Sequence, residues 1–167
     1  MSGLATWVVD AVLIGVGATA VMDLWALLQR RLLGIPSLDF AMVGRWLGHL
    51  PRGRFRHDGI GRSAVVGGER ALGWTAHYLI GVIFAGLLLA VVGLDWVRAP
   101  TLLPALAFGI LSVAAPFFIL QPGMGAGIAA SKMPAPGKAR LRSLVAHSVF
   151  GLGLYLAAAL LAAAGAE

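Results

Sequence analysis

The sequence contains no cysteine and very little charge for its length. Only 12% of its 167 residues are Asp, Glu, Lys or Arg, whereas soluble domains carry about 25%. Without cysteine there is no disulfide framework, no thiolate metal site and no cysteine nucleophile. Because 59% of the residues are hydrophobic and the mean hydropathy is +0.88, the composition excludes an ordinary soluble domain and predicts an integral membrane protein.

Four apolar runs are long enough to cross a bilayer, which takes about 20 helical residues. They cover residues 4–29, 71–94, 102–120 and 144–164. None alternates as the strands of a barrel do, and unpaired backbone groups cannot face lipid. We therefore predict an all-α membrane domain with four transmembrane helices. The first run carries Asp10 and Asp23 and lacks a basic start, which favours a retained helix over a cleavable signal peptide.

Basic residues are concentrated in two of the three connections. Loop 30–70 holds eight arginines and loop 121–143 holds four basic residues, whereas only Arg98 lies between the second and third runs. The positive-inside rule places both basic loops in the cytoplasm and both termini outside. Because the basic residues lie beside the membrane, we expect them to contact anionic lipid head groups or a partner, and not nucleic acid. This basic set comprises Arg52, Arg54, Arg56, Arg62, Arg70 and Arg140.

The first basic loop is predicted to begin with a short helix. In "SLDFAMVGRWLGHL" the residues Leu38, Met42, Trp46 and Leu50 recur at steps of four, and Ser37 is placed to cap the helix. Arg45 and His49 fall off this apolar stripe. Two placements stay open: an interfacial helix on the inner leaflet, or a helix packed on the protein's own cytoplasmic side. Residues 51–68 are rich in Gly and Arg and form either a mobile loop or one folded over the helix ends.

The third run contains Pro116, which should kink its helix, and is followed by Pro122. The glycines of "QPGMGAGIAASKMPAPGK" do not follow a strand or end in Gly-Lys-Ser/Thr, so this segment does not have the features of a phosphate-binding loop. We predict that it is a helix end followed by a linker.

The second and fourth runs repeat one pattern at an offset of 70 residues. Arg70 aligns with Arg140, Ala76 with Ala146, His77 with His147, Gly81 with Gly151, and Gly73 with the similarly small Ser143. We interpret this as a duplicated two-helix hairpin, of a kind known in transporters. Small residues four before and four after each histidine let another helix approach, so Gly73, Gly81, Ser143 and Gly151 are expected to pack helices and both histidines to face protein.

Ionisable side chains fall at a similar depth on three of the predicted helices. His77 and His147 each lie seven residues above an arginine, and Asp23 lies seven before Arg30 on a helix of opposite direction. Gln121 joins them from the third helix. We predict a polar intramembrane layer of Asp23, His77, His147 and Gln121. Because buried charge is costly in a bilayer, the layer either locks the helices together or binds or passes protons, a metal ion or a small polar substrate.

Two cofactors are compatible with this layer. Two histidines on separate membrane helices are the axial ligands of haem b in membrane cytochromes. Asp23 with both histidines would supply three ligands to zinc, although the spacing sets no geometry.

The segments "GATAVMDLWALLQRRLLGIPS", "VGRWLGHLPRGRFRH", "GERALGWTAHYLIG" and "LRSLVAHSVFGLGLY" resemble a family of small bacterial inner-membrane proteins known as a domain of unknown function. The resemblance covers nearly the whole chain. It implies four membrane helices in the bacterial cytoplasmic membrane, with both termini then periplasmic, and implies no activity.

Three functions remain as hypotheses: a small transporter or channel using the polar layer, a structural or accessory subunit that recruits partners through its basic loop, and a bis-histidine haem b protein. No nucleophile and base are assembled in the sequence, which argues against an enzyme. Four helices enclose little volume, and Gly15, Gly17 and Ala18 present a face of small residues. We therefore expect a homo-oligomer or a larger membrane complex.

Overall fold

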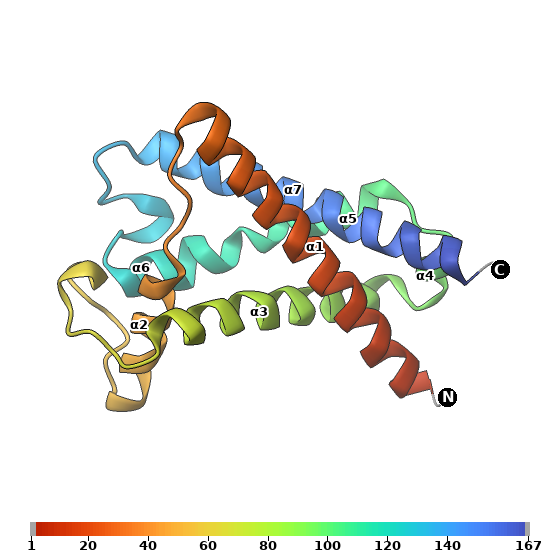
Figure 1. The fold of residues 1–167 in the computed structure, drawn as a ribbon, viewed down its shortest axis with the longest axis horizontal. Helices are drawn as coiled ribbons and strands as arrows, with labels where there is room; N and C mark the ends of the chain where they lie inside the picture. Colours follow the sequence, from red (N-terminus) through yellow and green to blue (C-terminus); the bar gives the residue numbers. More distant parts are fainter. Residues whose placement is uncertain (1–2, 166–167) are drawn as a thin grey trace. The chain divides into compact units, whose positions relative to one another are not determined.

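The protein is built around four long apolar helices. The computed structural model describes residues 3–165, and all regular structure in this range is helical. The long helices are α1 (Gly3–Leu33), α3 (Glu69–Val92), the run Leu102–Met124 that starts with α5 (Leu102–Ser112), and α7 (Pro136–Ala164) (Figure 1). Each is long and apolar enough to cross a membrane, which confirms the predicted all-α class and the four transmembrane helices.

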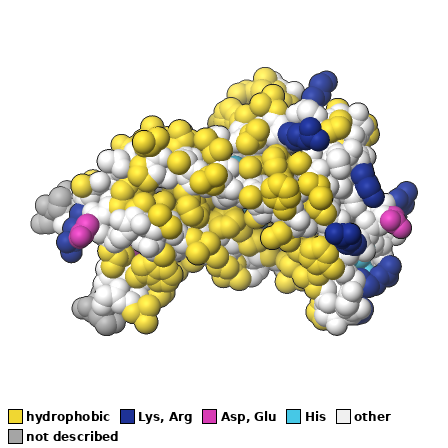
Figure 2. All heavy atoms as spheres, turned by 180° about the vertical axis from the view of Figure 1, so that it is seen from behind, with side chains coloured by type: hydrophobic (Ala, Val, Ile, Leu, Met, Phe, Trp, Pro, Cys, Tyr) yellow, Lys and Arg dark blue, Asp and Glu magenta, His cyan; other side chains and the backbone are white. Residues whose placement is uncertain are grey.

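The surface of these helices is apolar. Each of them exposes large hydrophobic side chains, among them Leu4, Ile83, Leu111 and Leu160, and hydrophobic side chains dominate the face drawn in Figure 2. A soluble monomer rarely exposes so much contiguous apolar surface. The helices therefore require lipid around them, and the chain is a multi-pass membrane protein.

The chain divides into two compact units. The helical unit comprises the residues up to Pro36, Tyr78–Ser112 and the residues from Val145 onward. The loop unit comprises Ser37–His77 and Val113–Leu144. It gathers both basic loops together with the helix ends that flank them, as expected if the two loops lie on one side of the membrane.

The helical unit is packed through small residues. Its core includes Ile14, Ala18, Leu88 and Leu154, each no more than 1% exposed. A side-chain carbon on Gly81 would collide with Thr19 of α1. One on Gly151 would lie 2.8 Å from the carbonyl oxygen of Ala105 on α5. The two glycines aligned by the 70-residue repeat therefore make equivalent close contacts, α3 with α1 and α7 with α5.

The small face of α1 is occupied within the chain. Gly15 lies against the backbone of Gly81 and Val82, and Gly17 lies against Ala157 of α7. Gly153 of α7 lies against Ala18, which is fully buried. This face was the sequence evidence for association between chains, so a homo-oligomer now has no support from these residues and stays a prediction.

The loop unit starts with the predicted short helix, α2 (Phe40–His49). Asp39, and not Ser37, caps it: the Asp39 side chain accepts a hydrogen bond of 2.9 Å from the Ala41 N–H. Gly44 of α2 meets the backbone of α3 at Glu69 and Gly73, and α2 also contacts α6 (Gln121–Met124) and η2 (Ile60–Arg62) (Figure 1). Of the two placements left open by the sequence, the structure has the helix packed on the protein itself.

The third long helix widens at Pro116. Residues Pro116–Leu120 (η3) form a π turn, in which the Gln121 N–H reaches back to the Pro116 carbonyl. Because proline lacks an N–H, an α-helical turn cannot be completed there, and a π turn re-pairs part of the backbone. The helix then continues through α6 and ends at Gly125, whose φ is 94°.

The second basic connection is shorter than the predicted loop 121–143. Gln121 is the first residue of α6, and α7 begins at Pro136. The predicted bounds followed hydropathy, whereas the first turns of α7 are basic and helical. Proline is favoured in the first turn of a helix, where its missing N–H costs nothing. The segment between α6 and α7 contains one short helical turn, η4 (Ile128–Ala130).

Candidate functional site

The loop unit is held together by an ion pair that the sequence pattern did not indicate. Arg45 of α2 donates from Nε to Glu69 Oε2 at 2.8 Å and from Nη2 to Glu69 Oε1 at 2.7 Å. The two side chains are only 9% and 13% exposed. Two parallel charge-assisted bonds of this kind fix both position and angle, so the pair ties α2 to the first turn of α3.

The same two side chains also hold the loop between these helices. The Arg45 Nη1 donates to the carbonyls of Gly61 and Ser63, at 3.3 and 3.4 Å. Glu69 Oε2 accepts the backbone N–H of Val66 at 3.0 Å. The hydrogen bond with Glu69 raises the pKa of the Arg45 guanidinium, which therefore stays charged. Of the two alternatives for residues 51–68, the structure has the folded loop.

Two buried histidines complete this polar core. His49 Nε2 lies 3.0 Å from the Ala64 carbonyl, and His57 Nδ1 lies 2.9 Å from Ser63 Oγ. Because a carbonyl only accepts, His49 carries its hydrogen on Nε2. The two rings are 5.2 Å apart. His49 Nδ1 and His57 Nε2 are both buried without a hydrogen-bond partner, so half of this histidine pair's hydrogen-bonding capacity is unused.

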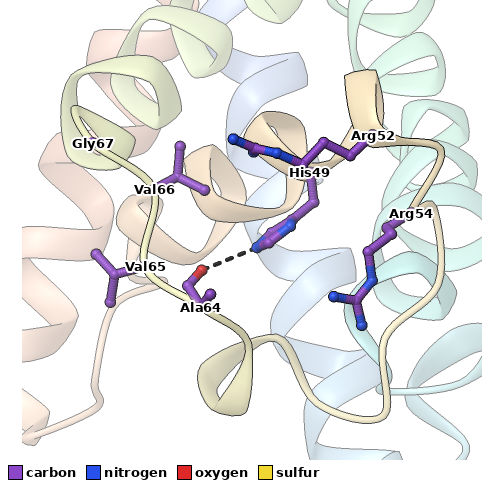
Figure 3. Close-up of a pocket in the computed structure, with 7 residues that line it drawn as sticks. All are labelled: His49, Arg52, Arg54, Ala64, Val65, Val66 and Gly67. Atoms are coloured by element: carbon purple, nitrogen blue, oxygen red, sulfur yellow. Dashed lines mark hydrogen bonds between the residues drawn. The ribbon is translucent and has the colours of Figure 1, made fainter.

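A pocket of about 420 Å³ opens over this core. It is lined by His49, Arg52, Arg54 and residues 64–67. Figure 3 shows the two arginines on the segment that follows α2, facing residues 64–67 across the pocket, with His49 hydrogen-bonded to Ala64 between them. No lining residue carries a carboxylate, so the pocket is positively charged.

In the helical unit, two predicted layer residues each bond a neighbouring helix. Tyr78 of α3 donates its hydroxyl to Asp23 Oδ2 of α1 at 2.9 Å. His147 Nδ1 of α7 lies 2.7 Å from Ser112 Oγ of α5. Because the Ser112 hydroxyl hydrogen goes to the Gly109 carbonyl at 2.6 Å, His147 Nδ1 is the donor. The sequence analysis singled out Asp23 and His147 but not their partners.

The other two layer residues belong to the loop unit. The His77 ring stacks on Phe40 of α2 at 4.1 Å and meets Trp74 edge-on at 5.8 Å. Gln121 Nε2 lies 3.4 Å from Ser143 Oγ, and Gln121 Oε1 is buried without a hydrogen-bond partner. A single layer that contains all four residues stays a prediction.

The remaining predicted residues divide between packing and surface roles. Gly73 carries the contact with α2, and Ser143 bonds Gln121. Arg52, Arg54, Arg56, Arg62, Arg70 and Arg140 are all exposed. Arg140 also donates from Nε to the Ala129 carbonyl at 2.8 Å. Ala129 and Ala130 both have positive φ, 46° and 58°, a backbone conformation that alanine rarely adopts, so Arg140 supports a strained turn.

The described residues do not support the zinc hypothesis. Among residues 3–165, no group of three or more His, Asp or Glu side chains is arranged to hold a metal ion. A zinc site needs three or four such ligands around one point.

A family model described as "Protein of unknown function (DUF2938)" matches residues 12–161. The chain belongs to the DUF2938 family. No curated protein matches the chain, and no solved structure does. The match confirms the resemblance noted in the sequence. Because the DUF2938 description states no activity, the function has to be argued from the residues.

Removing the Arg45–Glu69 pair should unfold the loop of this DUF2938 protein. In Arg45→Ala the Glu69 carboxylate and the carbonyls of Gly61 and Ser63 lose their partner, and such orphaned buried groups are costly. We expect the melting temperature in detergent to fall by several degrees and trypsin to cleave rapidly within residues 52–62. Arg98→Ala is the matched control, because the Arg98–Asp95 pair is 85% and 95% exposed and such pairs contribute little. Equal stability of both variants would contradict the assignment.

Proposed function

We propose that the protein is a small proton-conducting transporter or channel of the bacterial inner membrane. The observation that carries this proposal is the bond between the Asp23 carboxylate on α1 and the Tyr78 hydroxyl on α3. A carboxylate in an apolar membrane span is costly and by default marks an ion or proton path. The basic loops, on this proposal, lie in the cytoplasm and both termini in the periplasm.

The second helix pair supports the same proposal. His147 on α7 and Ser112 on α5 form another bond between two ionisable or exchangeable groups inside apolar spans. Carboxylate, phenol, hydroxyl and imidazole groups all accept and release protons, and such groups form the relays of pumps and transporters. A larger polar substrate is less well supported, because the pocket beside these helices, of about 380 Å³, is lined mainly by apolar residues such as Leu102 and Val149.

His147→Gln tests whether the imidazole is required. The purified variant is reconstituted into vesicles and the proton influx after an acid pulse is followed with an enclosed pH-sensitive dye. We expect influx well below that of the unaltered protein, because glutamine keeps a hydrogen-bonding group but cannot take up a proton. Tyr155→Phe removes a polar atom from the same helix and should keep the influx. If both variants match the unaltered protein, His147 has no part in conduction.

The accessory-subunit hypothesis is favoured by one separate observation. The first basic loop is folded by the Arg45–Glu69 pair, yet it presents Arg56 and Arg62 to solvent. A rigid basic surface suits an acidic protein partner. Replacing Arg56 with Glu should then remove a protein that co-purifies with the unaltered chain, whereas His147→Gln should not. If the Arg56 variant still co-purifies with the same proteins as the unaltered chain, this alternative is wrong.

Haem b is not proposed. It requires both imidazoles as axial ligands, and neither ring makes a contact that indicates a haem. His77 stacks on Phe40, and His147 bonds Ser112.

A further inference from the structure

We propose that the pocket above His49 binds a phosphate group, carried either by an anionic lipid or by a soluble phosphate ester. This inference goes beyond the proposed proton conduction and does not depend on it, because all residues that line the pocket belong to the loop unit.

The charge of the pocket selects the ligand class. Two guanidinium groups, those of Arg52 and Arg54, line it, and none of the lining residues is acidic. The nearby Glu69 carboxylate is already neutralised by its two bonds to Arg45. The planar fork of arginine donates two parallel bonds to phosphate, so two arginines that line one pocket match a phosphate better than they match a halide or a single carboxylate.

The Arg52 side chain and the backbone of Arg54 are positioned before any ligand binds. Arg52 Nη1 donates to the Gly48 carbonyl at 3.1 Å, which leaves its other N–H groups for a ligand. The Arg54 N–H donates to the His49 carbonyl at 3.3 Å and thereby fixes the backbone of this residue. His49 itself is 4% exposed and bonded to Ala64. A framework that is already ordered loses little conformational freedom on binding.

The size and the rim of the pocket suit an amphiphilic phosphate ester. A volume of about 420 Å³ falls within the range of about 300–1,000 Å³ typical of small-molecule sites, and exceeds what a bare phosphate needs. Val65 and Val66 line the pocket together with the arginines, and Val65 is 73% exposed. Apolar side chains beside arginines offer contacts to the carbon skeleton of a phosphate ester.

The experiment uses the full chain and separates the two sources of phosphate. In the soluble arm, glycerol 3-phosphate and inorganic phosphate are titrated into detergent-solubilised protein by calorimetry. In the lipid arm, the protein in nanodiscs of phosphatidylcholine is compared with nanodiscs containing phosphatidic acid, and the thermal stability is measured, because a ligand that binds only the folded state raises it. Binding in either arm supports the site and identifies the source.

The variants decide whether the pocket is responsible. Arg52→Gln with Arg54→Gln should weaken the titrated affinity about tenfold or more, or abolish the lipid-dependent shift, because both guanidinium groups that can donate charge-assisted hydrogen bonds to the phosphate are lost. The control, Lys132→Gln with Lys138→Gln, removes the same charge from exposed positions that do not line the pocket and are not among the arginines expected to contact lipid head groups. Arg54→Gln alone is included in case the double variant misfolds. It breaks no hydrogen bond of the Arg54 side chain and should therefore fold, but it should still weaken binding.

Two results would overturn the proposal. One is the absence of binding in both arms. The other is an equal loss of binding in the pocket and control double variants, which would reduce the effect to general surface charge. Neither result bears on proton conduction, which is measured separately.

Discussion

Gly44→Val is expected to release α2 from α3 and open the loop unit. Gly44 lies directly against the carbonyl of Glu69 and within reach of the Gly73 nitrogen, so any side chain there collides with backbone that cannot rotate away. Overpacking costs about 1–3 kcal/mol, and 1.4 kcal/mol corresponds to about tenfold in an opening equilibrium. Tryptic cleavage after Arg45, which is 7% exposed, should therefore accelerate about tenfold or more, as measured by mass spectrometry of the fragments.

Gly61→Ala provides the matched control for this prediction. This variant adds a methyl group in the same unit of the protein, the loop unit, but at a position where a side-chain carbon meets no atom within 4 Å. Cleavage after Arg45 should stay at the original rate in this variant. A Gly44→Val protein in which Arg45 remains as protected as before would show that α2 does not depend on the close approach to α3.

Asp23→Asn is expected to reduce proton influx to the rate of protein-free vesicles. The amide still accepts a bond from the Tyr78 hydroxyl, so the contact between α1 and α3 is kept, but the group no longer exchanges a proton. Influx after an acid pulse, normalised to the amount of protein that reconstitutes as a monodisperse species, is the measurement. A purely structural role for Asp23 predicts unchanged influx instead.

Two further variants sharpen the interpretation of Asp23→Asn. Asp10→Asn makes the same replacement on the same helix, at a position that we expect near the outer end of the span, and should retain influx. Tyr78→Phe leaves the Asp23 carboxylate in place but removes the hydroxyl that donates to it, and should give a partial loss of influx. If Asp10→Asn is as inactive as Asp23→Asn, proton influx depends on the total negative charge of α1, and Asp23 has no specific role in it.

The four transmembrane helices could be predicted from the sequence because each corresponds to one continuous run of apolar residues. Hydropathy averages over about 20 residues and needs no partner. The ends were harder to place. The start of α7 at Pro136 was missed because the turn that contains Lys138 and Arg140 is helical without being apolar.

The polar core of the loop unit could not be predicted because its partners are far apart in sequence. Arg45 and Glu69 are 24 positions apart, and neither lies in a motif. Arg45 and His49 are off the apolar stripe of α2, so hydropathy gives no sign that they are buried. They are buried because Glu69 and residues 61–64, which follow α2 in the chain, fold back onto them. A signal was available: Gly44 in α2 stands directly before Arg45, so a helix that approaches this glycine closely also covers the charged residue next to it.

The polar intramembrane residues were found, but their partners were not. Asp23 and His147 stood out as ionisable groups in apolar runs. Tyr78 and Ser112 did not, because tyrosine and serine are common in membrane helices and carry no charge. The bonds of 2.9 Å and 2.7 Å that join them depend on the rotation of each helix, which is set by the close contacts at Gly81 and Gly151.

The central claim, that this DUF2938 protein conducts protons, is tested most directly by the unaltered protein in vesicles. The initial rate of proton entry is recorded under a fixed potassium-driven membrane potential at a series of protein-to-lipid ratios. The rate should rise in proportion to the amount of protein and exceed that of protein-free vesicles. A rate equal to that of protein-free vesicles at every ratio, with the protein shown to be folded and inserted, would contradict the claim.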